Sequence, residues 1–200
     1  MMPRVFIVDD DPALRDALRQ LLETAGLQVE AYANGASFLA ACEHEQPDCV
    51  LLDVAMPGMS GYEVQASLNE RDMRFPVIFL TGHGDIPMAV NAVQAGAADF
   101  LEKPIQRDVL LERIRRALTL DEERREADRQ AEEIHRRHAR LSAREREVMA
   151  LVVSGLSSKE IARQLELSHR TVESHRTNIM NKMGATSLAE LITIAIHCDS

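Results

Sequence analysis

Short apolar runs alternate with amphipathic stretches along the first 120 residues. The apolar runs are typical of strands that are buried on both faces of a sheet. Between them, apolar residues recur at intervals of three and four, which predicts helices with one apolar face. The predicted strands are 4–8, 27–32, 48–52, 76–80 and 98–101. The helical spacing is clearest at Leu14, Leu18, Leu21 and Leu22, and again at Met88, Ala89, Ala92 and Val93.

Five such β-α repeats predict an α/β fold, a doubly wound five-stranded parallel sheet with right-handed crossovers. Local signals agree with this order of elements. Asp11 followed by Pro12 suits a helix start, with the aspartate as N-cap and the proline in the first helical position. Gly26 suits the end of that helix.

Reactive polar residues stand where the predicted strands end. Asp9 and Asp10 follow the first strand, Asp53 follows the third, Thr81 the fourth and Lys103 the fifth. Because the carboxyl ends of parallel strands form the ligand-binding edge of such a sheet, these five side chains should share one pocket. Clustered carboxylates repel one another unless a divalent cation neutralises them. The cluster therefore predicts metal-assisted phosphoryl chemistry on a carboxylate.

Charge is distributed unevenly along the chain. Residues 137–200 hold nine Lys and Arg against seven Asp and Glu, a net charge of +2. Since the whole chain has a net charge of −9, residues 1–136 have a net charge of −11. An acidic front part and a mildly basic end predict two modules with different partners.

The chain has no apolar run long enough to span a membrane and no signal-like N-terminus, so we expect a cytoplasmic protein. Its three cysteines, Cys42, Cys49 and Cys198, are widely spread and lack metal-ligand spacing. Reduced thiols are the expectation for such a pattern in the cytosol.

A highly charged segment, DEERREADRQAEEIHRRH, occupies residues 121–138. It lacks glycine and proline and is rich in good helix formers, so it predicts a helix. Pairs such as Glu133 with Arg137 have the i,i+4 spacing that supports an exposed helix. Two interpretations stay open: a solvated single-helix spacer, and a weak coiled-coil dimer contact through a seven-residue repeat. The repeat consists of Leu120, Ala127, Ile134 and Leu141.

Residues 139–200 have helical patterns throughout. Ser142 and Ser187, each with a glutamate three residues later, suit helix starts. Between these helices, a short helix at about 159–165 and a longer one at 169–183, stopped by Gly184, are separated by a tight turn. Two helices in this arrangement, the second rich in polar and basic residues, predict a DNA-binding helix-turn-helix.

The periodicity of 169–183 separates an inner face from an outer face. Val172, Ile179 and Met183 should pack inward with His175 beside them, while the polar face, which also carries Asn181, should point into the major groove. Arg176, Lys182 and Lys159 suit phosphate contacts. Glu173 is unusual on this face because its carboxylate repels phosphate, but it could accept a hydrogen bond from a cytosine amino group or orient a neighbouring arginine. The candidate DNA-contact residues are Lys159, Arg170, Thr171, Glu173, Ser174, Arg176, Thr177, Asn178 and Lys182.

With these residues in view, 4–120 resembles the receiver domain of two-component response regulators, on the motifs Asp9-Asp10, LLDVAMPGMSG, FLTGHGD and DFLEKP. Residues 141–200 resemble the LuxR-type helix-turn-helix output domain, on LSAREREVMALVVSGLSSKEIARQLELSHRTVESHRTNIMNKMG. The stretch GHGDIPMAVNAVQAGAADFLEKP is closest to the FixJ-like branch. The resemblance divides the chain into a receiver domain (1–120), a helical linker (121–138) and a four-helix DNA-binding domain (139–200).

The resemblance also implies a phosphoacceptor and a metal site. Asp53 would accept a phosphoryl group from a phosphohistidine of a sensor histidine kinase. Asp10, Asp53 and the backbone carbonyl of Ala55 would hold Mg²⁺, with Asp9 acting through water. Alanine at 55 offers no side chain to the phosphoryl group, which leaves the lifetime of the phosphorylated state open.

Two further positions would act with the phosphoryl group. Lys103 would pair with the phosphoryl oxygens, and Thr81 would donate a hydrogen bond to one of them. As Thr81 moves inward, the ring of Phe100 would fill the vacated space and remodel the face formed by residues 86–102, which dimerises in similar receivers. A plain core position is the alternative for Phe100.

The leading prediction is a transcription regulator, controlled by phosphorylation, that dimerises and binds promoter DNA and RNA polymerase. Beyond its own phosphorylation and dephosphorylation it would not be an enzyme. A constitutive DNA binder whose receiver is only a dimerisation platform is the alternative. A hydrolase with Asp53 as nucleophile ranks last, since Asp53-Val54-Ala55 supplies no second acid or base.

Overall fold

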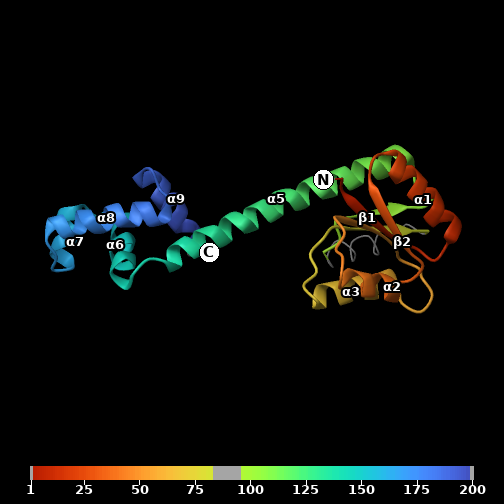
Figure 1. Cartoon of the computed structure of the whole chain (residues 1–200), viewed down its shortest axis with the longest axis horizontal. Helices are drawn as coiled ribbons and strands as arrows, with labels where there is room; N and C mark the ends of the chain where they lie inside the picture. The colour runs from red at the N-terminus through yellow and green to blue at the C-terminus, as the bar shows by residue number, and fades with distance from the viewer. Residues whose placement is uncertain (1, 83–95, 199–200) are drawn as a thin grey trace. The chain divides into compact units, whose positions relative to one another are not determined.

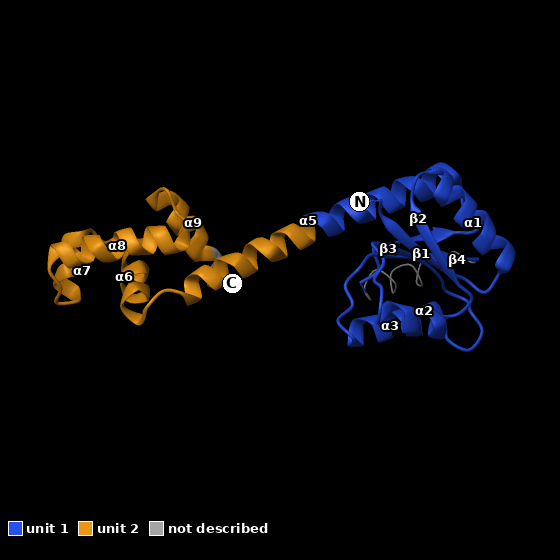
Figure 2. Cartoon of the chain, in the orientation of Figure 1, with its two compact units in different colours: residues 1–123 blue, residues 124–200 orange. Residues whose placement is uncertain are grey.

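The computed structural model describes residues 2–82 and 96–198, with side chains up to residue 196. The expected helix that carries Met88, Ala89, Ala92 and Val93 lies outside the described residues. The chain divides into two compact units, Met1–Glu123 and Arg124–Ser200 (Figure 2). Their boundary falls within a single helix, α5 (Arg107–Ala139).

The first unit contains a five-stranded parallel sheet in the order β2-β1-β3-β4-β5. This confirms the predicted fold class. The strands are β1 (Arg4–Val8), β2 (Gln28–Tyr32), β3 (Cys49–Asp53), β4 (Val77–Thr81) and β5 (Asp99–Glu102). Asp53 and Thr81 belong to their strands rather than following them, because Asp53 still pairs with Leu80 and Thr81 with Glu102. The polar residues at the strand ends are therefore held by the sheet itself.

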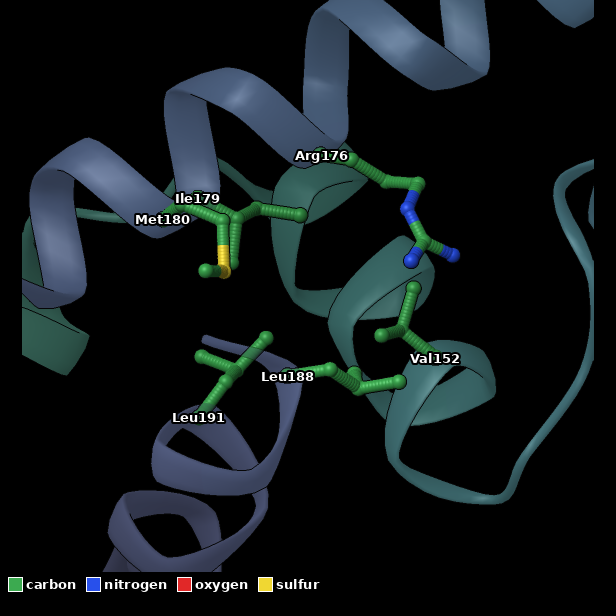
Figure 3. Close-up of a pocket in the computed structure, with 6 residues that line it drawn as sticks. All are labelled: Val152, Arg176, Ile179, Met180, Leu188 and Leu191. Carbon is green, nitrogen blue, oxygen red and sulfur yellow. The ribbon is translucent and has the colours of Figure 1, made fainter. Parts of the chain in front are cut away.

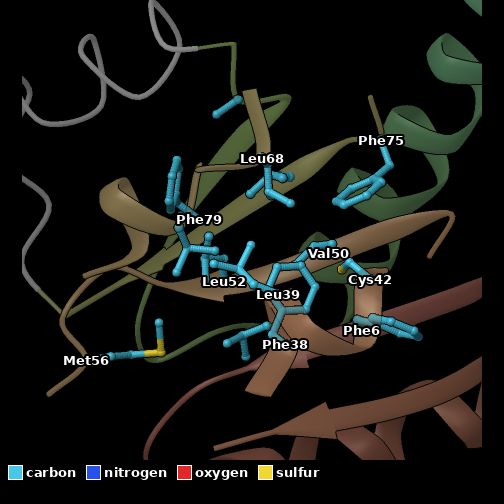
Figure 4. Close-up of a cluster of buried hydrophobic side chains, with 14 of the residues drawn as sticks. Phe6, Phe38, Leu39, Cys42, Val50, Leu52, Met56, Leu68, Phe75 and Phe79 are labelled. Carbon is cyan, nitrogen blue, oxygen red and sulfur yellow. The ribbon is translucent and has the colours of Figure 1, made fainter. Parts of the chain in front are cut away.

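Alternating side chains of β1 and β3 enter two separate cores, one on each face of the sheet. Phe6 and Leu52 pack with α2 (Gly35–Cys42) and α3 (Gly61–Glu70), the core shown in Figure 4. Ile7 and Leu51 pack on the other face. There they meet α1 (Pro12–Thr24) and the first three turns of α5 (Figure 1). The central strands β1, β3 and β4 are almost entirely buried, and their carboxyl ends form the edge at which a ligand can bind.

The predicted ends of α1 are confirmed. The Asp11 side chain accepts a hydrogen bond from the Ala13 amide, and Pro12 is the first helical residue. Gly26 follows with a left-handed φ of 84°, which glycine adopts at little cost. This helix start lies directly after Asp9 and Asp10, so the cap also fixes the chain beside the acidic residues.

The second unit holds α6 (Ala143–Val153), α7 (Ser158–Gln164), α8 (His169–Met183) and α9 (Leu188–Cys198) around one apolar core. The capping box of Ser142 with Glu145 and the left-handed Gly184 after α8 are confirmed. The start of α9 is only partly as predicted. Ser187 accepts from the Glu190 amide, but the Glu190 carboxylate accepts from the Thr186 amide and hydroxyl. The carboxylate thus turns to Thr186.

Cys42 and Cys49 are buried, unpaired thiols in the two different cores of the sheet. Burial raises the pKa of Cys42 to about 11 and that of Cys49 to about 12, so both are thiols at neutral pH. Within the described residues, no helix combines the length and the apolar character needed to cross a bilayer.

Candidate functional site

Three carboxylates meet at the carboxyl edge of the sheet. Asp9 and Asp10 follow β1, and Asp53 ends the neighbouring strand β3. One oxygen from each lies within 4.8 Å of the others. Asp9 is fully buried and Asp53 is 4% exposed, whereas Asp10 is exposed. Because three like charges at this spacing repel, the cluster is of the kind that a divalent cation would stabilise.

The Lys103 ammonium bridges the two buried carboxylates. Its Nζ lies 2.8 Å from Asp9 Oδ2 and 3.0 Å from Asp53 Oδ1. The backbone amide of Lys103 also donates to the Thr81 carbonyl, which places the residue directly beyond the β4–β5 ladder. Burial alone would lower the pKa of Lys103, but hydrogen bonds to Asp9 and Asp53 and their negative charges outweigh it and raise that pKa. The ammonium therefore stays charged through the physiological range.

The two buried carboxylates differ in how fully they are bonded. Asp9 accepts from the Asp11 amide at 2.9 Å through Oδ1 and from Lys103 through Oδ2. Asp53 receives Lys103 at Oδ1, and among the described residues no hydrogen bond to its Oδ2 is present. Asp9 is thus fixed in place, while Asp53 keeps one oxygen available for a metal ion or an electrophile.

The two predicted switch residues stand on the neighbouring strands β4 and β5. Thr81 is half-buried at the end of β4, beside the Lys103 backbone. Phe100 is 37% exposed on β5, so it is not a core residue in this structure. The alternative interpretation of Phe100 is therefore wrong. Of the face predicted to remodel, 86–102, only residues 96–102 are among those described.

The loop after Asp53 contains one residue of importance that sequence reasoning missed. Gly61 starts α3 and packs against the backbone of the phosphoacceptor candidate; a Cβ there would collide with the Asp53 carbonyl oxygen and lie 3.1 Å from the Val54 Cα. Its amide donates to the Val54 carbonyl at 3.0 Å. Ala55 lies exposed in this loop. Ser60 is the N-cap of α3, and its side chain accepts from the Glu63 amide. The signal in the sequence was a glycine at the first helical position after this cap, where the helix itself does not require glycine.

Replacing Gly61 with alanine should destabilise the first unit by about 1–3 kcal/mol, because the added methyl must displace strand backbone rather than a flexible side chain. Urea unfolding of the full chain measures this. Gly82→Ala is the matched control, since among the described residues beyond its chain neighbours no atom lies within 4 Å of a Cβ at Gly82, and it should change stability by less than about 0.5 kcal/mol. Equal stability of the two variants would contradict the assigned contact.

The second unit presents most of the predicted DNA-contact residues to solvent. The exposed ones are Lys159, Arg170, Glu173, Ser174, Thr177, Asn178 and Lys182, together with Asn181. Thr171 is half-buried, and its hydroxyl pairs with that of the capping Ser168. Thr177 donates to the Glu173 carbonyl within α8. The inner face, Val172, Ile179 and Met183, is buried as predicted, with His175 half-buried.

Two of the predicted phosphate contacts have other surroundings. Lys182 donates to the buried Glu145 carboxylate at 2.6 Å, which lies on α6. Arg176 lines a pocket of about 120 Å³ between α6, α8 and α9, together with apolar residues such as Val152 and Leu191 (Figure 3). Helical periodicity alone revealed neither neighbour, because both come from other helices.

Residues 5–115 match the family model described as response regulator receiver domain, and residues 139–195 match that of the bacterial regulatory proteins of the luxR family. The chain belongs to the response regulators. This response regulator is 42% identical over 193 residues to the transcriptional regulatory protein FixJ of Bradyrhizobium diazoefficiens, covering 96% of this chain and 94% of that protein.

Two further relatives agree. The response regulator protein TodT of Pseudomonas putida is 41% identical over 190 residues, or 95% of this chain and 84% of that protein. The solved structure of the response regulator StyR has a TM-score of 0.86 and 42% identity over 98% of this response regulator and 99% of that chain. The predicted family and its role in transcription regulation are confirmed.

Proposed function

We propose that Asp53 accepts a phosphoryl group from a sensor histidine kinase and that the phosphorylated chain dimerises and binds promoter DNA. The observation that carries the proposal is the unequal bonding of the two buried carboxylates. Asp9 is bonded at both oxygens, whereas Asp53 Oδ2 has no partner among the described residues. The nucleophile is thus the carboxylate that is anchored at one oxygen and available at the other.

In the transfer, Asp53 Oδ2 forms a bond to phosphorus as the bond from phosphorus to the kinase imidazole nitrogen breaks. Lys103 already lies 3.0 Å from Asp53 Oδ1, so its ammonium is placed to pair with the arriving phosphoryl oxygens. Thr81, at the end of β4, would donate its hydroxyl to another of these oxygens. The chain's chemistry is limited to gaining and losing this phosphoryl group.

The donor set fits a divalent cation. Three carboxylates and one ammonium have a formal charge of −2, and the carboxylate oxygens of Asp9, Asp10 and Asp53 come within 4.8 Å of one another. Oxygen ligands of this number suit Mg²⁺, which keeps several waters. Asp10, Asp53 and the Ala55 carbonyl would hold it, with Asp9 through water. Bound there, Mg²⁺ would neutralise charge on the transferred phosphoryl group.

The switch and the output follow from the same site. As Thr81 engages the phosphoryl group, exposed Phe100 would turn inward and remodel the dimerising face 86–102. Residues 1–120 would form the receiver, 121–138 the linker and 139–200 the DNA-binding domain. The exposed residues of α7 and α8 would contact DNA at two half-sites about 34 Å apart. Acting between a kinase, promoter DNA and RNA polymerase, the protein would work in the cytoplasm.

Beryllofluoride, a phosphoryl mimic, tests this proposal. The full chain with Mg²⁺ is compared with and without beryllofluoride, by sedimentation and by fluorescence anisotropy on duplexes that the treated protein selects from a random pool. We expect conversion to a dimer and at least tenfold tighter DNA binding, because a mimic on Asp53 favours one of two conformations. Unchanged mass and affinity would reject the proposal. Strong DNA binding in both samples would favour the constitutive alternative.

A further inference from the structure

The last turns of α5 contact the end of the recognition helix α8. Arg137 Nη1 donates a hydrogen bond to the Met183 carbonyl at 3.1 Å. Met183 is the final residue of α8, and carbonyls in the last turn of a helix have no partner within the helix. A cation is also favoured at this end by the helix dipole. Arg137 therefore acts as a cap for α8, supplied from the segment that was predicted to be a helical linker.

The Arg137 side chain is held in place from its own helix. Its Nε donates to Glu133 Oε1 at 2.9 Å, one turn earlier on α5. That hydrogen bond is the main reason why the pKa of Glu133 is lowered. Because residues four apart face each other only in a helix, this bond exists only while residues 133–137 are helical. The cap on α8 thus depends on the helical state of the linker.

The far side of the contact is closely fitted. Gly184, the residue after α8, has a left-handed φ of 71°, and a Cβ there would lie 2.5 Å from Arg137 Nη1. The guanidinium occupies the space that any other residue at 184 would need. A neighbouring arginine caps a helix in a similar way, since Arg144 donates to the carbonyl of Leu165, the C-cap residue of α7. Arg137 differs from Arg144 because it belongs to the linker part of α5 rather than to the four-helix domain that follows.

We propose that Arg137 is a positioning residue that couples the helical state of the linker to the C-terminal turn of the recognition helix. When α5 is intact through residue 137, the guanidinium caps Met183 and α8 is held to its last turn. When the end of α5 frays, the cap is lost and the end of α8 loosens. The inference rests on the proposed function only in taking α8 as the DNA-reading helix.

Arg136 offers a matched control. It pairs with the other oxygen of the same Glu133 at 2.6 Å, and Glu133 is its one partner among the described residues. Arg136→Met and Arg137→Met remove the same charge from adjacent positions, but only the second removes a contact with α8. Arg137→Lys keeps the charge and loses the planar fork.

Hydrogen exchange at the amides of Met180–Gly184 in the full chain is the first measurement. We expect Arg137→Met to accelerate it three- to tenfold, Arg137→Lys to fall between, and Arg136→Met to leave it at the wild-type rate. DNA affinity should follow the same order. Equal exchange rates in the Arg136 and Arg137 variants would overturn the proposal. Because exchange needs neither phosphorylation nor DNA, this result stands apart from any failure of phosphorylation-dependent binding.

The coupling itself is tested by weakening the linker helix. Ala131→Gly changes a residue six positions before Arg137 and lowers helix propensity without altering charge. It should accelerate exchange at Met180–Gly184 in the wild-type background and add nothing in the Arg137→Met background. A structural cap without coupling would instead give two independent effects that multiply. That result would overturn the proposal, since the linker would then reach α8 by another route.

Discussion

Replacing Asp53 with alanine should abolish the response to acetyl phosphate. The variant lacks the buried carboxylate of the acidic site whose second oxygen has no partner among the described residues, so phosphoryl incorporation measured by mass spectrometry should fall to background. Driving a two-state switch from 1:99 to 99:1 requires about 5.5 kcal/mol, and this variant would lose the whole of it. Dimer formation and DNA affinity should then stay at the level of the untreated protein.

The fold should survive this substitution. Asp53→Ala removes one of two carboxylates that share Lys103, and the ammonium keeps its 2.8 Å contact with Asp9. Asp16→Ala is the control, since it removes an exposed carboxylate of α1. It should be phosphorylated at the wild-type rate. An Asp53→Ala protein that still dimerised on treatment with acetyl phosphate would show that another residue is the phosphoacceptor.

Replacing Glu145 with alanine should destabilise the DNA-binding domain by about 2–4 kcal/mol. Glu145 is 4% exposed and accepts from both the Ser142 amide at 2.7 Å and Lys182 at 2.6 Å. Its loss removes a helix cap and leaves Lys182 unpaired on α8. Denaturant unfolding measures the effect. Glu147→Ala is the control: its exposed pair with Arg144 should contribute less than about 1 kcal/mol.

The same pair predicts a pH dependence. Hydrogen bonds from Lys182 and from the Ser142 amide lower the pKa of Glu145 to about 2, from an ordinary 4.5. A carboxyl group with a lowered pKa stabilises the folded state above its unfolded pKa and loses that contribution as pH falls through the folded one. The stability difference between wild type and Glu145→Ala should therefore be full above pH 4.5 and shrink toward pH 2. A difference independent of pH would contradict the ion pair.

The sequence predicted the sheet and its polar edge well because both depend on local patterns. Asp53 and Thr81 end apolar runs, and parallel strands bring such ends to one edge of the sheet regardless of the conformation of the connecting loops. Gly61 and Arg137 were out of reach for the opposite reason. The importance of Gly61 arises from close approach to the Asp53 backbone, and that of Arg137 from a carbonyl 46 residues away.

The DNA-contact prediction was limited in the same way. Periodicity placed Val172 on the buried face of α8 and Ser174 on its exposed face, and the structure agrees. It assigned Lys182 to DNA phosphate because of its charge. The periodicity of one helix could not reveal that the Lys182 ammonium donates to Glu145, a residue of another helix 37 positions earlier. A basic residue on a helix flank is ambiguous until its neighbours from other helices are known.

The pairing of β1 with β3 has a consequence for how freely this protein can diverge. Val8 lies opposite Leu52 in that ladder, so the residues that follow, Asp9 and Asp53, are set one strand spacing apart, about 4.8 Å. The distance between these two carboxylate residues is therefore set by backbone hydrogen bonds between β1 and β3 rather than by loop conformation. Surface loops and the output helices can be exchanged to suit a different kinase or a different operator while the distance between these carboxylates stays the same.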